Sequence, residues 1–177
     1  MTDERYDGIT IALHWLLAIL VVATYALGLL REELPRGEPR TLVLMLHTSI
    51  GLTVIAGTVL RMIWRGFRRP LPEVPGPAGL ALAAKLAHIA LYVAVLAVPV
   101  LGVASMWAKG RGIPVFGLTE LASPWPADRA LGKSLDKLHE AGAHLLVALA
   151  GAHAVAALAH HVLLRDNVLM RMLPRAR

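Results

Sequence analysis

Five histidines lie in the last long apolar stretch of the chain: His139, His144, His153, His160 and His161. An ionisable side chain is costly inside a bilayer, so each one marks a candidate functional site. At about 100° and 1.5 Å per residue, His139 and His153 lie about 40° apart around a helix and about 21 Å apart along it. One helix face therefore carries a histidine near each side of a membrane, which suits two cofactors stacked across the bilayer.

Two further histidines match these positions in depth. His14 lies near the start of the first apolar stretch, and His47 lies near the start of the second, at the opposite side. Two neutral imidazoles that face each other make an axial pair for a haem iron. At the outer level the spacing pairs His47 with His139. At the inner level His14 can meet either His153 or His160, and depth alone slightly favours His160.

Small and basic residues follow the histidines at helical spacing. Glycines leave room for a porphyrin between helices, although small residues also mediate ordinary helix packing in membranes. The glycines in question are Gly28, Gly51 and Gly142. Arg61 is 14 residues after His47, on the same helix face but at the inner level. The spacing predicts that Arg61 either pairs with a haem propionate or extends to the membrane interface.

The composition indicates a membrane protein. Of 177 residues, 56% are hydrophobic and 17% are charged, against about 25% charged in soluble domains. The chain contains no cysteine, which excludes disulfides, iron–sulfur clusters and covalently attached c-type haem. We expect one integral membrane domain over residues 1–177.

Four apolar stretches are long enough to cross a bilayer, which takes about 20 residues each. They cover residues 9–30, 41–64, 80–107 and 134–164. The predicted fold is therefore all-α, an integral membrane four-helix bundle with both termini on one side. Arginines cluster in residues 61–69 and in the tail 165–177. The excess of basic residues in cytoplasmic segments places both termini in the cytoplasm.

The net charge of +6 does not indicate nucleic-acid binding, because the basic residues lie at the ends of the apolar stretches, as membrane topology requires. The connection before the last stretch holds five of them. A positive field there would attract a small anion or an acidic donor protein. The residues are Lys109, Arg111, Arg129, Lys133 and Lys137.

The chain resembles the bacterial di-haem cytochrome b561 family over essentially its whole length. The resemblance rests on I-A-L-H-W-L, L-H-T-S-I-G, A-H-I-A-L-Y, F-G-L-T, D-K-L-H-E, G-A-H-A-V-A-A-L-A-H-H and the tail R-D-N-V-L-M-R-M-L-P-R. It implies two haem b groups, with His14 and His153 holding the inner haem and His47 and His139 the outer one. These four histidines would be the axial ligands of the iron. The implied inner pair overrides the depth preference for His160.

Some members of this family oxidise superoxide on the outer side and pass the electron to ubiquinone. The resemblance implies the same reaction here, in the bacterial inner membrane, with lipid, quinone and superoxide as partners and no protein partner required. Quinone takes up protons when reduced, and His160, with an ordinary pKa of about 6.5, is free to supply them. His88 enters the third span from the same side and is a second candidate for the quinone site.

Two alternatives remain at this point. The chain could be a haem b anchor that relays electrons from another donor protein. A different class is a haem-free transporter that uses histidines as a proton relay. A transporter of this kind would be colourless, so the absorption of the purified protein separates the classes.

Overall fold

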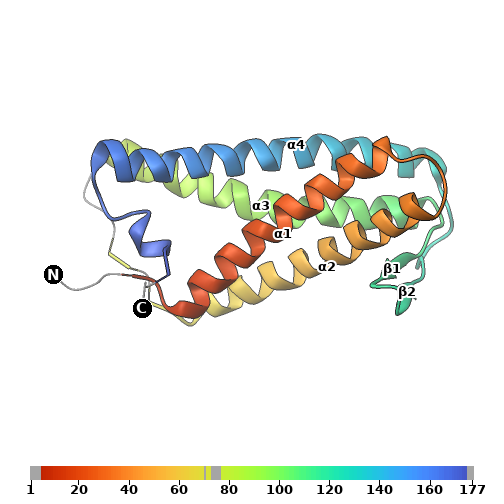
Figure 1. Ribbon diagram of the computed structural model, residues 1–177, viewed down its shortest axis with the longest axis horizontal. Helices are drawn as coiled ribbons and strands as arrows, with labels where there is room; N and C mark the ends of the chain where they lie inside the picture. The colour runs from red at the N-terminus through yellow and green to blue at the C-terminus, as the bar shows by residue number, and fades with distance from the viewer. Residues whose placement is uncertain (1–4, 70, 73–76, 175–177) are drawn as a thin grey trace.

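A computed structural model describes residues 5–69, 71–72 and 77–174 as a bundle of four long helices (Figure 1). The helices are α1 (Gly8–Glu33), α2 (Glu38–Gly66), α3 (Ala78–Ala108) and α4 (Arg129–Ala159). A π-helical turn, η1 (His160–Leu164), continues α4, and a short 3-10 helix, η2 (Met170–Met172), lies in the tail. All four long helices are apolar enough to cross a membrane, so the predicted all-α membrane bundle is confirmed.

The helices begin at residues suited to helix starts. The Asp7 carboxylate accepts a hydrogen bond from the Thr10 backbone N–H at 3.1 Å, and the Asp128 carboxylate accepts bonds from the first turn of α4 in the same way. A side-chain oxygen before a helix satisfies backbone donors that have no partner inside it. Pro39 lies in the first turn of α2, where its missing N–H costs nothing.

Asp7 also fastens α1 to α2. The Trp64 indole donates a hydrogen bond of 3.0 Å to the same carboxylate. Burial opposes ionisation of Asp7, but the hydrogen bonds from Thr10 and Trp64 and the nearby Arg68 guanidinium outweigh it and lower the pKa. The carboxylate therefore stays charged near neutral pH, as a cap of α1 requires.

Several small polar residues lie inside the bundle beside apolar ones, and many large apolar residues face outward. Thr10, Ser49, Thr58 and Ser105 are all less than 2% exposed. Ile19, Val22 and Val155, by contrast, are more than 60% exposed. Outward-facing apolar side chains are expected where the surrounding solvent is lipid rather than water.

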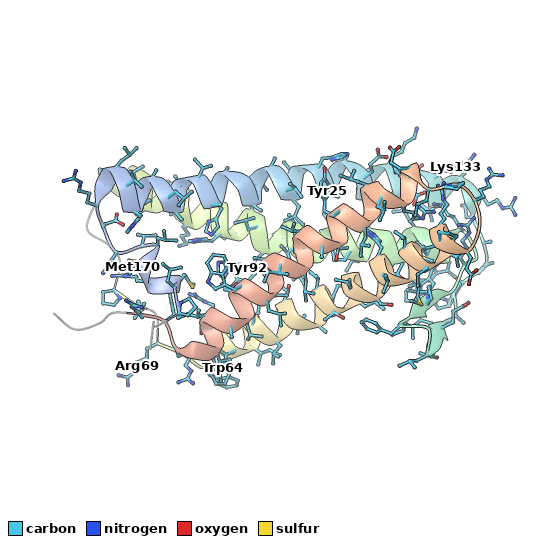
Figure 2. The ribbon with its side chains drawn as sticks, in the orientation of Figure 1. Tyr25, Trp64, Arg69, Tyr92, Lys133 and Met170 are labelled. Carbon is cyan, nitrogen blue, oxygen red and sulfur yellow. The ribbon has the colours of Figure 1, made fainter. Side chains whose placement is uncertain are left out.

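The helices pack as two pairs, α1 along α2 and α3 along α4, with α2 joining α3. In the part of the chain that is described, α1 and α4 have almost no backbone contact with each other. The first and last described segments meet at one end, where the Tyr6 N–H donates to the Arg171 carbonyl at 3.1 Å. This end is called the terminal end; Arg69 lies there and Lys133 lies at the opposite end (Figure 2).

The opposite end carries a short hairpin that the sequence did not predict, and is called the hairpin end. Strand β1 (Ile113–Val115) pairs antiparallel with β2 (Thr119–Leu121), Ile113 opposite Leu121. Phe116 and Gly117 both have positive φ in the turn between them. The hairpin is attached to α2, because the Ser49 hydroxyl accepts from the Phe116 N–H at 2.7 Å.

Candidate functional site

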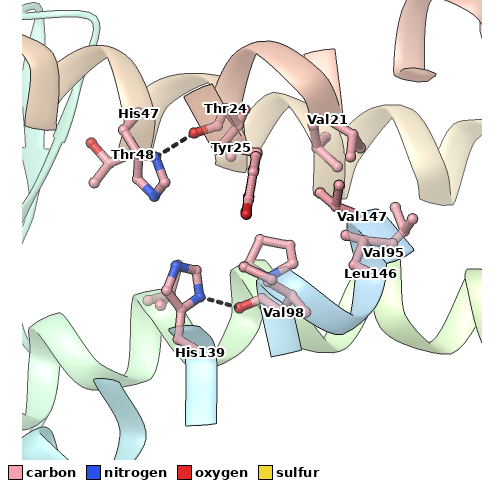
Figure 3. A pocket seen from close by; sticks show the side chains of 16 residues that line it. Val21, Thr24, Tyr25, His47, Thr48, Val95, Val98, His139, Leu146 and Val147 are labelled. Atoms are coloured by element: carbon pink, nitrogen blue, oxygen red, sulfur yellow. Dashed lines mark hydrogen bonds between the residues drawn. The ribbon is translucent and has the colours of Figure 1, made fainter. Parts of the chain in front are cut away.

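Two histidines face each other across the bundle near the hairpin end (Figure 3). His47 comes from α2 and His139 from α4, and their ring centroids are 5.9 Å apart at an interplanar angle of 87°. The structure thus brings together the two residues that the spacing paired at the outer level.

Each of these rings is held by a backbone carbonyl. His47 Nδ1 lies 2.8 Å from the Thr24 carbonyl oxygen, and His139 Nδ1 lies 2.8 Å from that of Val98. A carbonyl only accepts, so Nδ1 carries the hydrogen in both rings and Nε2 keeps a lone pair. A histidine oriented in this way is prepared to bind a metal through Nε2.

Two glycines leave the space in which the rings of His47 and His139 reach these carbonyls. Gly28 is four residues after Thr24, and a Cβ atom there would lie 3.3 Å from the His47 ring. Gly102 is four residues after Val98, and its Cβ would lie 3.0 Å from the His139 ring. The sequence pointed to Gly28 but missed Gly102. A signal was present, because Gly102 follows His88 by 14 residues, as Gly28 follows His14.

The arrangement at the hairpin end is therefore repeated in the two helix pairs. Thr24 and Gly28 on α1 receive His47 from α2, and Val98 and Gly102 on α3 receive His139 from α4. Positions on α3 follow their counterparts on α1 by 74 residues, and positions on α4 follow those on α2 by 92. The same set of contacts is therefore made once in each half of the chain.

That space is a cavity. It holds about 620 Å³ of empty volume when the space at its open mouth is included. Its walls are mainly apolar, with valines from all four helices. Gly51 contributes to them, as expected, whereas a Cβ on Gly142 would meet Val98 at 3.0 Å, so Gly142 serves helix packing. Other lining residues are Val21, Val54, Val95, Leu146 and Val147.

The terminal end holds a cluster of three histidines. The rings of His14 and His153 lie 6.3 Å apart at 82°, and those of His88 and His153 lie 5.4 Å apart at 69°. The structure thus brings together His14 and His153, the inner pair implied by the resemblance. It also places His88 in ring contact with His153, a proximity that spacing along single helices did not reveal.

Arg61 lies in the same cluster. Its guanidinium donates a hydrogen bond of 2.8 Å to His14 Nδ1. Arginine is always a donor, so neutral His14 carries its hydrogen on Nε2 here. A metal on Nε2 needs the opposite tautomer, so Arg61 has to release His14 when a haem binds. The terminal end is therefore less prepared for a metal than the hairpin end.

Buried guanidinium nitrogens without a hydrogen-bond partner among the described residues occur at both ends of the bundle. They include Nε of Arg61, and Nε of Arg31 in the last turn of α1 at the hairpin end. Buried polar groups are normally paired, so both nitrogens fit a bound carboxylate. The sequence had singled out Arg61 but not Arg31.

Both histidine pairs fit a haem. Imidazole nitrogens lie about 2 Å from a first-row metal, so two rings on opposite sides of one iron have centroids about 6 Å apart. The observed separations are 5.9 and 6.3 Å. No group of three or more ligating side chains suited to a bare metal ion occurs in the described residues. Two histidines suffice for an iron whose other four positions are porphyrin nitrogens.

His160 is held away from this cluster. Its Nδ1 lies 2.6 Å from an Asp166 carboxylate oxygen, at the π-helical turn where α4 ends. Burial opposes ionisation of Asp166, but the hydrogen bonds from His160 and from the Val168 N–H outweigh it and lower the pKa. Arg165 between them has a φ of 53°, a strained value for a residue with a side chain. Asp166 was not predicted.

The hairpin end also has a basic hollow of about 480 Å³. Of the five cations predicted to steer an anion, it brings together four, while Lys137 is exposed but is not part of the lining. Asp136 lies in the same hollow, where Ser105 and Lys109 both donate to its carboxylate. The hollow therefore keeps a positive excess. The cations in its lining are Lys109, Arg111, Arg129 and Lys133.

Comparisons with known proteins agree with this site. A family model described as prokaryotic cytochrome b561 matches residues 5–175. Cytochrome b561 homolog 1 of Escherichia coli (strain K12) is 36% identical over 175 residues, covering 97% of this chain and 98% of the relative. Homolog 2 of the same organism is 34% identical over 99% of this chain and 94% of the relative. A Yersinia pestis protein named probable superoxide oxidase CybB is 31% identical over 98% of both chains. The chain belongs to the prokaryotic cytochrome b561 family of haem b-containing membrane electron-transfer proteins.

Proposed function

We propose that this oxidoreductase carries electrons across the bacterial inner membrane through two haem b groups, oxidising superoxide on the periplasmic side and reducing ubiquinone on the cytoplasmic side. The observation that supports this best is the pair of histidine sites at opposite ends of one bundle, each with the ring separation of two ligands on one iron. The name of the Yersinia pestis relative supports the choice of superoxide.

The side chains would divide the binding between them. His47 and His139 would bind one iron through Nε2 at the hairpin end, and His14 and His153 would bind the other at the terminal end. Arg31 and Arg61 would pair with the propionates. Each haem, once bound, supplies a one-electron carrier in the membrane interior.

We assign the hairpin end to the periplasm. Arg61, Arg65, Arg68 and Arg69 lie near the end of α2, and the tail adds Arg165 and Arg171, all toward the terminal end. An excess of basic residues marks the cytoplasmic side. The basic hollow then opens to the periplasm, where superoxide or an acidic donor would arrive.

The proposed reaction balances simply. Each superoxide gives up one electron and leaves as O₂, and two electrons with two protons convert ubiquinone to ubiquinol. Rapid mixing of the purified protein with superoxide should reduce the haem, and added decylubiquinone should reoxidise it. Haem that stays oxidised under superoxide would contradict the assignment of the substrate.

The charge of the hollow should control the rate of this reaction. We expect the double variant Arg129→Glu, Lys133→Glu to react about tenfold more slowly with superoxide at low ionic strength, because a positive field steers anions. The difference should shrink at about 0.15 M salt, where the screening length is about 8 Å. Stopped-flow absorbance measures both rates.

Arg69→Glu is a control, because it reverses one positive charge at the opposite end of the bundle. It should leave the rate unchanged. Rates that respond to neither the hollow variants nor salt would contradict steering of an anion by this surface.

A second donor class also has support. The hollow of about 480 Å³ is far larger than a diatomic anion, and it would admit acidic side chains of a donor protein. In that case the chain is a haem b relay for another protein. The mixing experiment distinguishes a superoxide oxidase from a relay, since a relay would be reduced by the donor protein and not by superoxide.

His160 and Asp166 would form the site at the terminal end where ubiquinone accepts electrons. The carboxylate fixes the His160 ring, and an imidazole held in this way can both hydrogen-bond a quinone carbonyl and pass on a proton. His88, in ring contact with His153, would offer a second donor.

His160→Ala should keep both haems and their reduction from the periplasmic side, but slow reoxidation by decylubiquinone about 10²-fold, as loss of a general acid does. Asp166→Asn should slow it less and shift its pH profile. His161→Ala, an exposed neighbour, is the control and should react normally. If His160→Ala loses the inner haem, then His160 is a ligand; if it turns over normally, the quinone site is elsewhere.

A further inference from the structure

Tyr25 on α1 and His144 on α4 form an unusual pair inside the membrane. The Tyr25 hydroxyl lies 2.8 Å from His144 Nδ1, and the rings meet edge to face at 5.7 Å. Tyr25 is about 12 Å along α1 from its end at Glu33, well within a hydrocarbon core of about 30 Å. His144 is exposed at the outside of the bundle, where the surroundings at this depth are lipid tails.

One hydrogen-bond donor of the Tyr25–His144 pair has no acceptor within the pair. A neutral histidine carries one N–H and tyrosine carries one O–H, and the bond between them uses one of the two. The other has no acceptor among the described residues. An unsatisfied donor is costly in hydrocarbon, so a bound acceptor would stabilise this arrangement.

The pair also lies between two helices whose backbones have little contact. In the described chain α1 and α4 have almost no backbone contact, whereas α2 and α3 pack together. Tyr25 lines the cavity between His47 and His139, and its side chain projects into this cavity beside the two rings (Figure 3). Tyr25 therefore connects the exposed His144 with the cavity at the hairpin end.

The opposite side of the bundle provides an internal comparison. By the offsets of 74 and 92 residues, the counterparts of Tyr25 and His144 are Pro99 on α3 and Leu52 on α2. Neither has a polar side-chain atom. The donor pair and the sparse backbone contact thus occur together on one side only of an otherwise repeated arrangement, which packing of the bundle does not require.

We propose that Tyr25 and His144 form a lateral binding site for a quinone ring, entered from the lipid between α1 and α4, at the level of the hairpin-end cavity. A quinone carbonyl supplies the missing acceptor, its flat ring fits between the two helices, and its tail remains in the bilayer. This site is separate from the acceptor site at His160, which lies at the other end of the bundle.

Photolabelling tests the proposal without turnover. The haem-loaded protein in quinone-free lipid nanodiscs is irradiated with a short-tailed azido-ubiquinone, and labelled peptides are identified by mass spectrometry. We expect label on α1 near Tyr25 and on α4 near His144, displaced by decylubiquinone. The segments around Leu52 and Pro99 should show background label. Label spread evenly over all lipid-facing segments would overturn the proposal.

Variants then test the two side chains. Tyr25→Phe and His144→Leu should each reduce the site's affinity about five- to tenfold, the effect of one hydrogen bond, with haem content unchanged. His144→Asn keeps an N–H donor and should retain most of the labelling, and His160→Ala should not affect it. Undiminished labelling in Tyr25→Phe and His144→Leu would overturn the site, whatever superoxide does to the haems. If His144→Leu loses haem, Tyr25→Phe, which removes a single oxygen, decides.

Discussion

His47→Ala is expected to remove the haem at the hairpin end and to leave the haem at the terminal end in place. His47 and His139 come from helices in different pairs, and each ring is fixed by its own carbonyl, 2.8 Å away. Loss of one imidazole would leave the iron with one protein ligand and enlarge the cavity beside it. The haem content measured by the pyridine haemochrome assay should fall from two haems per chain to one.

His139→Ala should give the same result, since it removes the other half of the pair. Thr48→Ala, next to His47 in sequence, is the control and should keep both haems. Loss of both haems from His47→Ala would show that neither is held alone, and retention of both would contradict the pairing.

A second large effect is expected at the terminal end, where three histidines compete for two ligand positions. His153→Ala should lose the terminal-end haem, because His153 is in ring contact with both other histidines. His14→Ala should also lose it, whereas His88→Ala should retain it. The reason is that the separation of 6.3 Å between His14 and His153 fits two ligands of one iron, and the resemblance to the family assigns the same pair.

Haem content and the absorption spectrum of each variant measure this outcome. If His88→Ala loses the haem while His14→Ala keeps it, the inner pair is His88 with His153. In that case the hydrogen bond between Arg61 and His14 would remain in the haem-loaded protein.

Much of the site followed from helix geometry alone. His47 and His139 were predicted to share a depth, and the structure brings them together. The groups that orient the two rings could not be predicted in the same way. They are the backbone carbonyls of Thr24 and Val98, which have no side-chain signature in the sequence. Gly102 and Arg31 were missed because their roles depend on which helices become neighbours.

The depth preference for His160 stays a prediction, and a local irregularity weakens the geometry on which it depends. Counting residues assumed a regular α-helix to the end of the last span. The structure has a π-helical turn from His160 to Leu164 and directs His160 to Asp166. Nothing in the apolar pattern marks that change, since it depends on a strained Arg165 and a carboxylate beyond the span.

Hydropathy located the spans but not the helix ends. The last span was predicted at 134–164, while α4 begins at Arg129, after the Asp128 cap. Polar helical turns outside the bilayer have no hydropathy signal. The hairpin was not predicted for a related reason, because its three-residue strands are too short to show an alternating sequence pattern. Membership of the cytochrome b561 family also sets aside the haem-free transporter.

The central claim is that one chain holds two haem b groups, one at each end of the bundle. The most direct test is the pyridine haemochrome content of the purified wild-type protein, measured against its polypeptide concentration. The proposed sites predict two haem b per chain. One haem per chain, or none, would contradict the account.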